Sequence, residues 1–298
     1  MRNAAKPAVL SVGRLYCDLI FTDLPRLPTL GTEVFGAGFS VHPGGGAFIT
    51  AAHLSELGHA SSLASMLPSS PFAELVSGDL EASRVDLSLS GTLPASSGPQ
   101  ITVAMVEGGD RAFLTRRAGP ALPKLSAAEL AKHDFRHLHI GELASLLAEP
   151  GIIALARKMG MTISVDCSWD DNLSPTDVSA LAGKIDVFLP NEAEHEAIQR
   201  MLVGDRLAPI TVIKRGAAGA VAITDAGTLS APTKPRNAVD TTGAGDAFNA
   251  GFLSVWLEGG DLRRCLAAGN SQGAKAIQQR GGFCPAEGQP SEFGVAGE

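Results

Sequence analysis

The sequence lacks the features that would point to a nucleic acid or a membrane as a partner. Its 298 residues carry a formal net charge of −7 and contain no run of basic residues, so binding to a nucleic acid is not expected. No stretch approaches the roughly 20 apolar residues that a membrane-spanning helix requires. The first residues, MRNAAKPAVLSVG, hold an apolar run too short for a secretory signal. We therefore expect a cytoplasmic protein that contacts neither membrane nor nucleic acid.

Cysteine motifs and the two familiar nucleotide motifs are also missing. The four cysteines lie far apart and form no CxxC pair, which favours buried or free thiols in a reducing compartment. Gly183-Lys184 is followed by Ile185, so the pattern GxxxxGK[ST] does not occur, and no GxGxxG opens a strand–helix turn. The chain therefore lacks both the Walker and the Rossmann fingerprints.

What the chain does contain is an alternation of short β-branched runs with helical patterns. Such alternation predicts a parallel sheet with helices on both faces. Apolar residues make up 45% of the chain, which is ample for one large core. Strands are expected at 8–16, 61–67, 135–141, 161–167 and 184–190, with three more after 203. Helices are expected at 47–58, 71–82, 145–159, 174–183, 192–202, 244–258 and 261–279.

Two stretches interrupt the alternation. Residues 14–43 are extended and rich in Pro and Gly, and residues 98–117 resemble a hairpin that turns at 107–110. Two extended insertions in an α/β domain can pair into a small separate sheet. A lid over the crevice at the strand ends is the natural use of such a sheet, and two unrelated surface loops are the alternative.

The stretch DTTGAGDAFNAGF, residues 240–252, carries the strongest chemical signal. Gly243 and Gly245 flank Ala244 just before a helical pattern, where free backbone N–H groups form a site for phosphate-like oxygens. Asp246 follows in the first helical turn. An aspartate there can simply offset the helix dipole. Alternatively, the turn holds a phosphoryl group in transfer while Asp246 accepts the proton of the attacking hydroxyl.

Two weaker motifs precede it. In LPNEAE, Asn191 and Glu194 occupy the N-cap and N3 positions of a helix, so a capping pair is one explanation. The other is that the pair organises hydrated Mg²⁺ near a phosphate at the end of a strand. In KRGAAGA, Lys214, Gly216 and Gly219 form a glycine loop that either contacts a nucleotide or only joins two strands.

Two further patterns have simpler interpretations. Ser271 lies in a GxSxG match, but the residues on both sides have a helical pattern, whereas a serine nucleophile elbow needs a strand before it. We therefore do not expect a serine hydrolase. His137 and His139 alternate with apolar residues, and no matching third ligand follows, so we interpret them as two polar positions on one strand face.

Taken together, these pieces resemble the ribokinase-like (PfkB) carbohydrate kinase family along nearly the whole chain. Residues 240–252 look like the C-terminal signature of the family, and HPGGGAFITAAHLSELG, residues 42–58, resembles its N-terminal signature. VGRLYCDLI resembles the first strand with its substrate-binding Asp18, PNEAE the NxxE motif and KRGAAG the nucleotide loop. The resemblance implies one three-layer α/β/α domain over residues 1–298, with 14–43 and 98–117 forming a β-sheet lid.

The resemblance further implies an ATP- and Mg²⁺-dependent kinase that phosphorylates a hydroxyl of a small sugar-like molecule. Asp246 would be the base, and the backbone of 242–245 the anion hole. The lid often forms a homodimer contact in the family. The sugar would be held by Asp18, Gly44, Gly45 and Glu142, at a site that also includes position 49. The nucleotide and Mg²⁺ would involve Asn191, Glu194, Lys214, Gly216, Gly219, Thr242 and Asn270. Asp240 and Thr242 match positions that bind a monovalent cation such as K⁺.

One departure concerns the substrate. The N-terminal signature of the family usually carries an asparagine where this chain has Ile49, so a hydrogen bond to a substrate hydroxyl is lost. A different or less hydroxylated substrate is expected. A nucleoside kinase of the same fold and a non-catalytic sugar-binding sensor remain the alternatives.

Overall fold

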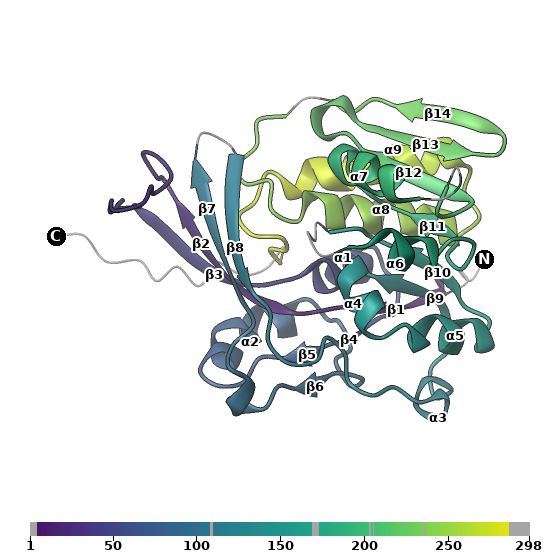
Figure 1. Cartoon of the computed structure of the whole chain (residues 1–298), viewed down its shortest axis with the longest axis horizontal. Helices are drawn as coiled ribbons and strands as arrows, with labels where there is room; N and C mark the ends of the chain where they lie inside the picture. The colour runs from purple at the N-terminus through teal and green to yellow at the C-terminus, as the bar shows by residue number, and fades with distance from the viewer. Residues whose placement is uncertain are drawn as a thin grey trace.

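A central sheet of eight strands runs through the molecule (Figure 1). The computed structural model describes residues 5–107, 110–168, 173–202, 204, 206–234 and 236–285. In spatial order the strands are β14 (Gly227–Ala231), β13 (Ala220–Thr224), β12 (Ile210–Lys214), β11 (Val187–Phe188), β10 (Thr162–Val165), β9 (Phe135–Ile140), β1 (Ala8–Val12) and β4 (Ser61–Ala64). All neighbours from β4 to β12 pair in parallel, and only β13 and β14 join antiparallel. The predicted mainly parallel sheet is confirmed.

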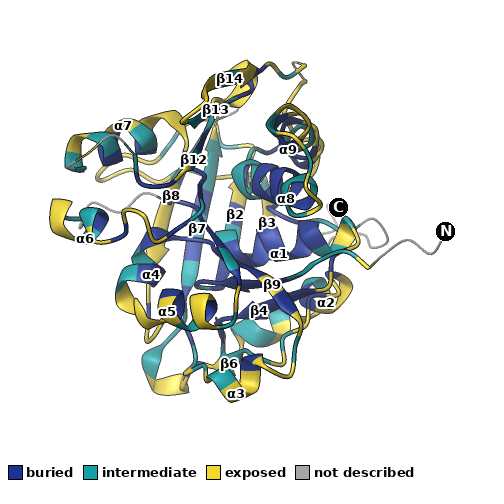
Figure 2. Cartoon of the chain, turned by 90° about the vertical axis from the view of Figure 1, so that its right-hand side faces the viewer, coloured by how far each residue is buried: buried dark blue, intermediate teal, exposed yellow. Residues whose placement is uncertain are grey.

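Helices cover both faces of this sheet (Figure 2). One layer contains α1 (Gly46–Glu56), α8 (Ala244–Leu257) and α9 (Leu262–Ala276), and the other α4 (Leu143–Ala148), α5 (Gly151–Lys158), α6 (Pro175–Ser179) and α7 (Glu192–Met201). Successive strand residues serve opposite layers: Val9 packs in a cluster with Leu54 of α1, while Leu10 packs in another with Leu143 of α4. Because both faces are covered, the strands β1, β4, β9 and β10 are almost entirely buried, including their serine and histidine residues.

A four-stranded sheet lies beside the central one (Figure 1), with the order β3 (Gly38–Gly44), β2 (Tyr16–Thr22), β7 (Ile101–Glu107) and β8 (Asp110–Arg116). The two extended stretches of the sequence therefore do pair with each other, through β2 and β7 in parallel. Residues 108 and 109 of the expected hairpin turn lie outside the described residues. That this four-stranded sheet moves as a lid stays a prediction.

The remaining elements pack around these two sheets. They are β5 (Met66–Leu67) and β6 (Gly91–Thr92), which form a two-stranded sheet, α2 (Phe72–Ala82), α3 (Ala127–Leu130) and the 3₁₀ turns Ala95–Ser97 and Gly216–Ala218. The pairing of β5 with β6 was not predicted from the sequence. Within the part of the chain that the structure describes, no helix combines the length and hydropathy needed to cross a membrane.

Several predicted boundaries were wrong. The strand expected at 8–16 ends at Val12, the strand expected at 61–67 is divided into β4 and β5, and the helix expected at 174–183 is the shorter α6. The single helix expected at 145–159 is divided into α4 and α5, with Pro150 at the N-cap of α5. Proline disfavours helical geometry in the residue before it, so the break at Glu149 follows from the local sequence. The strand expected at 184–190 is only the two residues of β11.

Candidate active site

The start of helix α8 forms the predicted anion-binding turn. Gly243 is the N-cap and adopts the left-handed conformation, with φ 69° and ψ 2°. A Cβ at this position would lie 2.5 Å from the Cα of Gly282, so both the backbone angle and the packing require glycine. The N–H groups in the first turn of a helix have no acceptors within the helix and carry partial positive charge. The turn at 243–245 therefore presents backbone donors suited to an anion.

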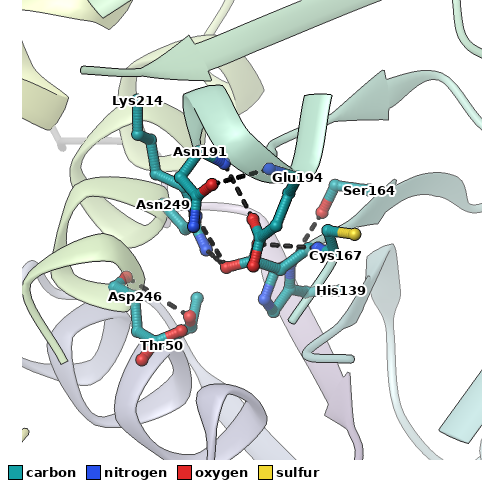
Figure 3. A network of polar contacts seen from close by, with 10 residues as sticks. Thr50, His139, Ser164, Cys167, Asn191, Glu194, Lys214, Asp246 and Asn249 are labelled. Atoms are coloured by element: carbon teal, nitrogen blue, oxygen red, sulfur yellow. Dashed lines mark hydrogen bonds and ion pairs between the residues drawn. The ribbon is translucent and has the colours of Figure 1, made fainter. Parts of the chain in front are cut away.

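Asp246 lies at the point where two helices begin. It belongs to the first turn of α8, and a Cβ on Gly46, the first residue of α1, would lie 2.7 Å from its Oδ1. Thr50 of α1 donates a hydrogen bond from Oγ1 to the backbone oxygen of Asp246, at 3.3 Å, which ties the two helices together (Figure 3). Only glycine at position 46 lets α1 approach the carboxylate this closely.

A buried charged cluster lies next to the turn at 243–245. It consists of Lys214 at the end of β12, Asn249 of α8 and Asp166, the residue after β10. The Nζ of Lys214 donates to the Oδ2 of Asp166 at 2.8 Å and to the Oδ1 of Asn249 at 3.3 Å. Asn249 donates from Nδ2 to the same oxygen of Asp166, at 2.5 Å. Figure 3 shows Lys214 and Asn249 side by side above Asp246. The cluster fixes one ammonium group next to the turn at 243–245.

The surroundings of Asp246 change its affinity for protons. Burial, followed by the negative charge of Asp166, raises the pKa of Asp246 to about 7. The cations of Lys214 and Arg111 oppose this rise, while Glu194 adds to it. A carboxyl with a pKa near neutrality suits a general base, because it can both accept and release a proton at the working pH.

Asn191 and Glu194 form the predicted capping box of α7. The Oδ1 of Asn191 accepts from the N–H of Glu194, and the Oε2 of Glu194 accepts from the N–H of Asn191, both at 2.8 Å. The capping interpretation is thus confirmed. Glu194 is also buried, and burial, then Asp166, raises its pKa. An isolated bridge pairs Asn191 with Lys214, so the motif adjoins the charged cluster. A role toward Mg²⁺ stays a prediction.

Asp18 lies beside Gly44, the last residue of β3, and Gly45, the N-cap of α1. Asp18 lies on β2 and is hydrogen-bonded to Thr102 of β7, and its burial raises its pKa to about 7. A Cβ on Gly44 would collide with the Asp18 carboxylate. Gly45 has φ 99°, and a Cβ there would collide with the backbone oxygen of Arg14. The glycines therefore let the entry to α1 pass directly beside the carboxylate.

Glu142 follows Gly141, the residue after β9, and is hydrogen-bonded to the four-stranded sheet. It accepts hydrogen bonds from Ser145 and from the hydroxyl of Tyr16 on β2, the latter at 3.3 Å. Arg14 approaches it with 3.8 Å between Nε and Oε1, and also donates to the side chain of Gln100 at 2.5 Å. Glu142 is thus held at the junction of the two sheets.

Ile49 of α1 is only 3% exposed and faces the C-terminal segment. A Cβ on Gly282 would collide with its side chain, and Ile49 packs in the same apolar cluster as Phe283. This contact gives the apolar residue a packing reason. The effect of Ile49 on the substrate stays a prediction.

The residues expected around the nucleotide are less closely gathered. Gly216 and Gly219 have φ values of 52° and 87° and lie in the turn between β12 and β13, where Gly216 is exposed and Gly219 is buried. Asn270 of α9 donates from Nδ2 to the backbone oxygen of Ala231 at 2.9 Å. It therefore anchors the chain after β14. Nucleotide contacts of these three residues stay predictions.

Asp240 and Thr242 lie in the loop that leads into the turn at 243–245. The two carboxylate oxygens of Asp240 accept from the N–H of Thr242 at 2.8 Å and from the N–H of Gly281 at 2.9 Å. The hydroxyl of Thr242 is buried, with no hydrogen-bond partner among the described residues. Oxygen groups of this kind suit a hard cation.

Three residues of the site were missed by the sequence analysis. Asp166 and Asn249 complete the charged cluster. Arg111 of β8 donates a hydrogen bond to Thr241, just before the turn at 243–245. Arg111 thereby links the four-stranded sheet to the anion-binding turn. The only sequence signal was the position of Asp166 at the end of an expected strand, where ligands commonly bind in α/β sheets.

The two patterns that were set aside have the expected structural roles. Ser271 lies inside α9. His137 and His139 are fully buried and hydrogen-bonded to Ser164, with 2.8 Å from Nε2 of His137 and 2.9 Å from Nδ1 of His139. Burial lowers the pKa of His139 to about 4, so it is neutral.

Comparison with known proteins agrees with this geometry. A family model described as pfkB family carbohydrate kinase matches residues 6–287. The ATP-dependent ribose-1-phosphate kinase of Halopiger xanaduensis is 29% identical over 285 residues, which cover 92% of this chain and 93% of that protein. The fructokinase of Rhizobium leguminosarum bv. trifolii is 27% identical over 269 residues, covering 83% of this chain and 78% of that protein.

The fold is shared with solved structures as well. The nucleoside kinase of Methanocaldococcus jannaschii, described as an archaeal member of the ribokinase family, superposes with a TM-score of 0.77 at 20% identity. The superposition covers 93% of this chain and 94% of that one. The three-layer arrangement with a separate small sheet is therefore the ribokinase fold, and the family match spans nearly all of the chain. The chain belongs to the pfkB family of carbohydrate kinases.

Proposed function

We propose that this kinase transfers the γ-phosphoryl group of ATP to a hydroxyl of a small sugar or sugar-like molecule, with Asp246 as the general base. The observation that carries the proposal is the position of Asp246. Its carboxylate adjoins both the anion-binding turn of α8 and the start of α1, the helix that the Gly44–Gly45 entry leads into. A proton acceptor and a phosphate site are thus adjacent, as phosphoryl transfer requires.

The residues present fit ATP and Mg²⁺. Gly243 and Gly245 leave the backbone donors of the turn open to a phosphate, and Lys214 adds a positive charge beside them. When bound, ATP supplies the phosphoryl group, and Mg²⁺ neutralises charge on its phosphates. Glu194 is the carboxylate that would hold the hydrated ion, with Asn191 fixing its orientation through the capping box. The oxygen atoms of Asp240 and Thr242 would hold a K⁺ ion, and we therefore expect K⁺ to activate the enzyme.

The sugar would occupy the space bordered by Asp18, Gly44, Gly45 and Glu142. Asp18 and Glu142 are buried acceptors on either side of the entry to α1, and each is suited to a hydroxyl group. The lid function of the four-stranded sheet belongs to the same proposal, since Arg111 and Tyr16 extend from it toward the two halves of the site. The proposal also includes a homodimer formed through this lid and a location in the cytoplasm.

A nucleoside kinase is the second candidate, because the chain shares its fold with the nucleoside kinase of Methanocaldococcus jannaschii. Ile49 replaces the asparagine usual in the family and fits a different or less hydroxylated substrate, and its buried side chain packs against the segment at Gly282. The similarity to a ribose-1-phosphate kinase and a fructokinase favours a sugar instead.

The test is release of ADP from ATP and Mg²⁺ with a panel of sugars, sugar phosphates and nucleosides. Turnover with a sugar-like acceptor supports the proposal, and turnover with nucleosides alone supports the second candidate. Sugar binding by calorimetry without any turnover would instead identify a sensor and refute both kinase assignments. The Asp246→Asn protein, run with the same acceptor, shows whether turnover belongs to this site.

A further inference from the structure

We propose that His42 is a specificity-determining residue, whose Nε2 atom binds a second hydroxyl group of the acceptor beside the one bound by Asp18. This inference rests on the proposed function and narrows its substrate class to molecules that carry hydroxyl groups on adjacent carbon atoms. A sugar and a nucleoside can both meet this condition, so the inference holds for either candidate.

The first step is the position of His42 beside the proposed sugar ligand. His42 lies on β3 directly opposite Asp18 on β2, and the two strands are antiparallel. Residues paired in this way point to the same face of a sheet, with Cβ atoms about 5 Å apart. Burial raises the pKa of Asp18, while the hydrogen bond from Thr102 and the charge of His42 oppose this rise. The imidazole ring is therefore close enough to act on the Asp18 carboxylate.

The second step is the state of the two ring nitrogens. His42 is only 3% exposed, and its Nδ1 lies 2.9 Å from the Oδ2 of Asp79 on α2. Because a carboxylate only accepts, Nδ1 donates this bond, and Nε2 on the other side of the ring points away from Asp79. Nε2 is buried and has no hydrogen-bond partner among the residues that the structure describes. Buried polar groups rarely lack a partner, and a hydroxyl group of a bound substrate supplies the one missing here.

The third step is the segment that His42 shares with Ile49. A Cβ on Gly281 would lie 2.9 Å from the Cδ2 of His42, and a Cβ on Gly282 would collide with Ile49. The two side chains therefore border successive residues of one segment. The hydrogen bond that asparagine usually supplies at position 49 is lost on α1, and His42 supplies one from β3 instead. The substrate keeps a polar contact, but from a different direction.

The fourth step is the chemistry of the ligand. Asp18 accepts a hydrogen bond from one hydroxyl group. A second hydroxyl group can either donate to Nε2 or accept from it, so it fits both protonation states of the ring. Because the Cβ atoms of Asp18 and His42 are only about 5 Å apart, the two hydroxyl groups have to be close neighbours. Hydroxyl groups on adjacent carbon atoms satisfy this condition.

The alternative is that His42 only attaches β3 to α2 through Asp79. Two variants separate the roles. The amide nitrogen of asparagine takes the place of Nδ1, so His42→Asn keeps the donor to Asp79 and removes the group at Nε2. The amide nitrogen of glutamine takes the place of Nε2, so His42→Gln keeps a polar group there and loses the donor to Asp79. A purely structural role makes His42→Gln the more damaging variant, whereas a substrate contact makes His42→Asn the more damaging one.

The measurement is the Kd, by calorimetry, of ribose, fructose and inosine and of their monodeoxy analogues, with Mg²⁺ and a non-hydrolysable ATP analogue present. We expect His42→Asn to bind the preferred probe about tenfold more weakly, the size of one hydrogen bond, and His42→Gln to lose less. Both variants should keep the wild-type affinity for the ATP analogue. Removal of one hydroxyl group from the probe should weaken wild-type binding by a similar factor and have no further effect in His42→Asn. The same series with Asp18→Asn should identify the hydroxyl group on the adjacent carbon.

Three results would overturn the proposal. They are the absence of binding by every probe, a larger loss in His42→Gln than in His42→Asn, and coupling of His42 and Asp18 to hydroxyl groups that are not adjacent. If neither His42 variant folds, the wild-type series decides, because two adjacent hydroxyl groups must each contribute to binding. Binding needs no turnover, so a protein that binds these probes but releases no ADP would refute the kinase proposal and leave this inference standing.

Discussion

Replacement of Asp246 by asparagine should separate the activity of the protein from its stability. Asparagine keeps the size of the side chain but cannot accept the proton of an attacking hydroxyl. Loss of a general base typically lowers the rate by about 10²–10⁴-fold, and we expect kcat to fall within this range. The affinity for ATP should change little, because the backbone donors of the turn remain. An aspartate that only offset the helix dipole would leave kcat near normal.

The pKa of Asp246 adds a second signature. The carboxylate is the form that accepts a proton, and its pKa lies at about 7. In the wild-type protein kcat/KM should therefore be half-maximal near that pH and fall about tenfold for each further unit toward acid. The residual activity of Asp246→Asn should not show this limb. A wild-type profile that is flat from neutral pH down to about pH 5 would contradict the assignment.

The same pKa predicts a gain in stability. Folding raises the pKa of Asp246 from 3.8 to about 7, so the folded state holds the proton more tightly than the unfolded chain. Ionisation of the carboxyl therefore destabilises the folded protein. The destabilisation is complete above the folded-state pKa of about 7, decreases as the pH falls, and is absent below the unfolded-state pKa of 3.8. Each pKa unit corresponds to about 1.4 kcal/mol, which sets a ceiling of about 4 kcal/mol. Because Asp246 is only half-buried, we expect a gain of about 1–2 kcal/mol in Asp246→Asn at pH 8.

The assay is thermal unfolding and steady-state kinetics on one preparation. A gain of this size should raise Tm by roughly 2–6 °C at pH 8 and by less at pH 5. Asp261→Asn is the matched control, since Asp261 caps α9 through a 2.9 Å bond from the N–H of Arg264 and asparagine caps equally well. The control should change neither kcat nor Tm. A lower Tm in Asp246→Asn together with normal kcat would refute the reasoning.

Three further changes test the rest of the site. Asp18→Ala should raise the KM for the sugar by roughly 10–150-fold, because a charged hydrogen bond is lost, and should leave the KM for ATP unchanged. Unchanged sugar kinetics would show that the sugar does not bind at Asp18. Gly45→Ala should lower Tm clearly, because φ is 99° and the methyl group meets Arg14, whereas Gly151→Ala, with no atom within 4 Å of its Cβ, should not. K⁺ should accelerate turnover over a large organic cation at equal ionic strength if Asp240 and Thr242 hold an ion, and equal rates would remove that site.

The parts of the fold that could be predicted are those set by local pattern. Alternating strands and helices identified the mainly parallel sheet, and the glycines identified the turn at the start of α8, because backbone geometry and helix ends leave local signals. The break between α4 and α5 was also readable, since Pro150 disfavours a helix at Glu149. It was missed because the apolar pattern continued across it.

The charged cluster could not be predicted in the same way. Asp166, Lys214 and Asn249 come from a strand end, another strand and a helix, and no spacing in the sequence relates them. They meet because β10 and β12 flank β11 while α8 lies on the face of the sheet. Arg111 likewise reaches Thr241 only because β8 is placed at the edge of the four-stranded sheet. Such contacts depend on the assembled topology.

The parallel pairing of β2 with β7 also determines when the substrate site can form. Cys17 pairs with Ile101, and the chain between them contains α1, β4 and α2, so the four-stranded sheet closes a very long loop. Contacts so distant in sequence slow folding, because the entropy of loop closure is lost before the pairing stabilises the chain. The central sheet carries the same cost, because β1 pairs with β9 across a still longer stretch of chain. Both sheets should therefore close late in folding, and the proposed site, which draws residues from both, should form only when folding is nearly complete.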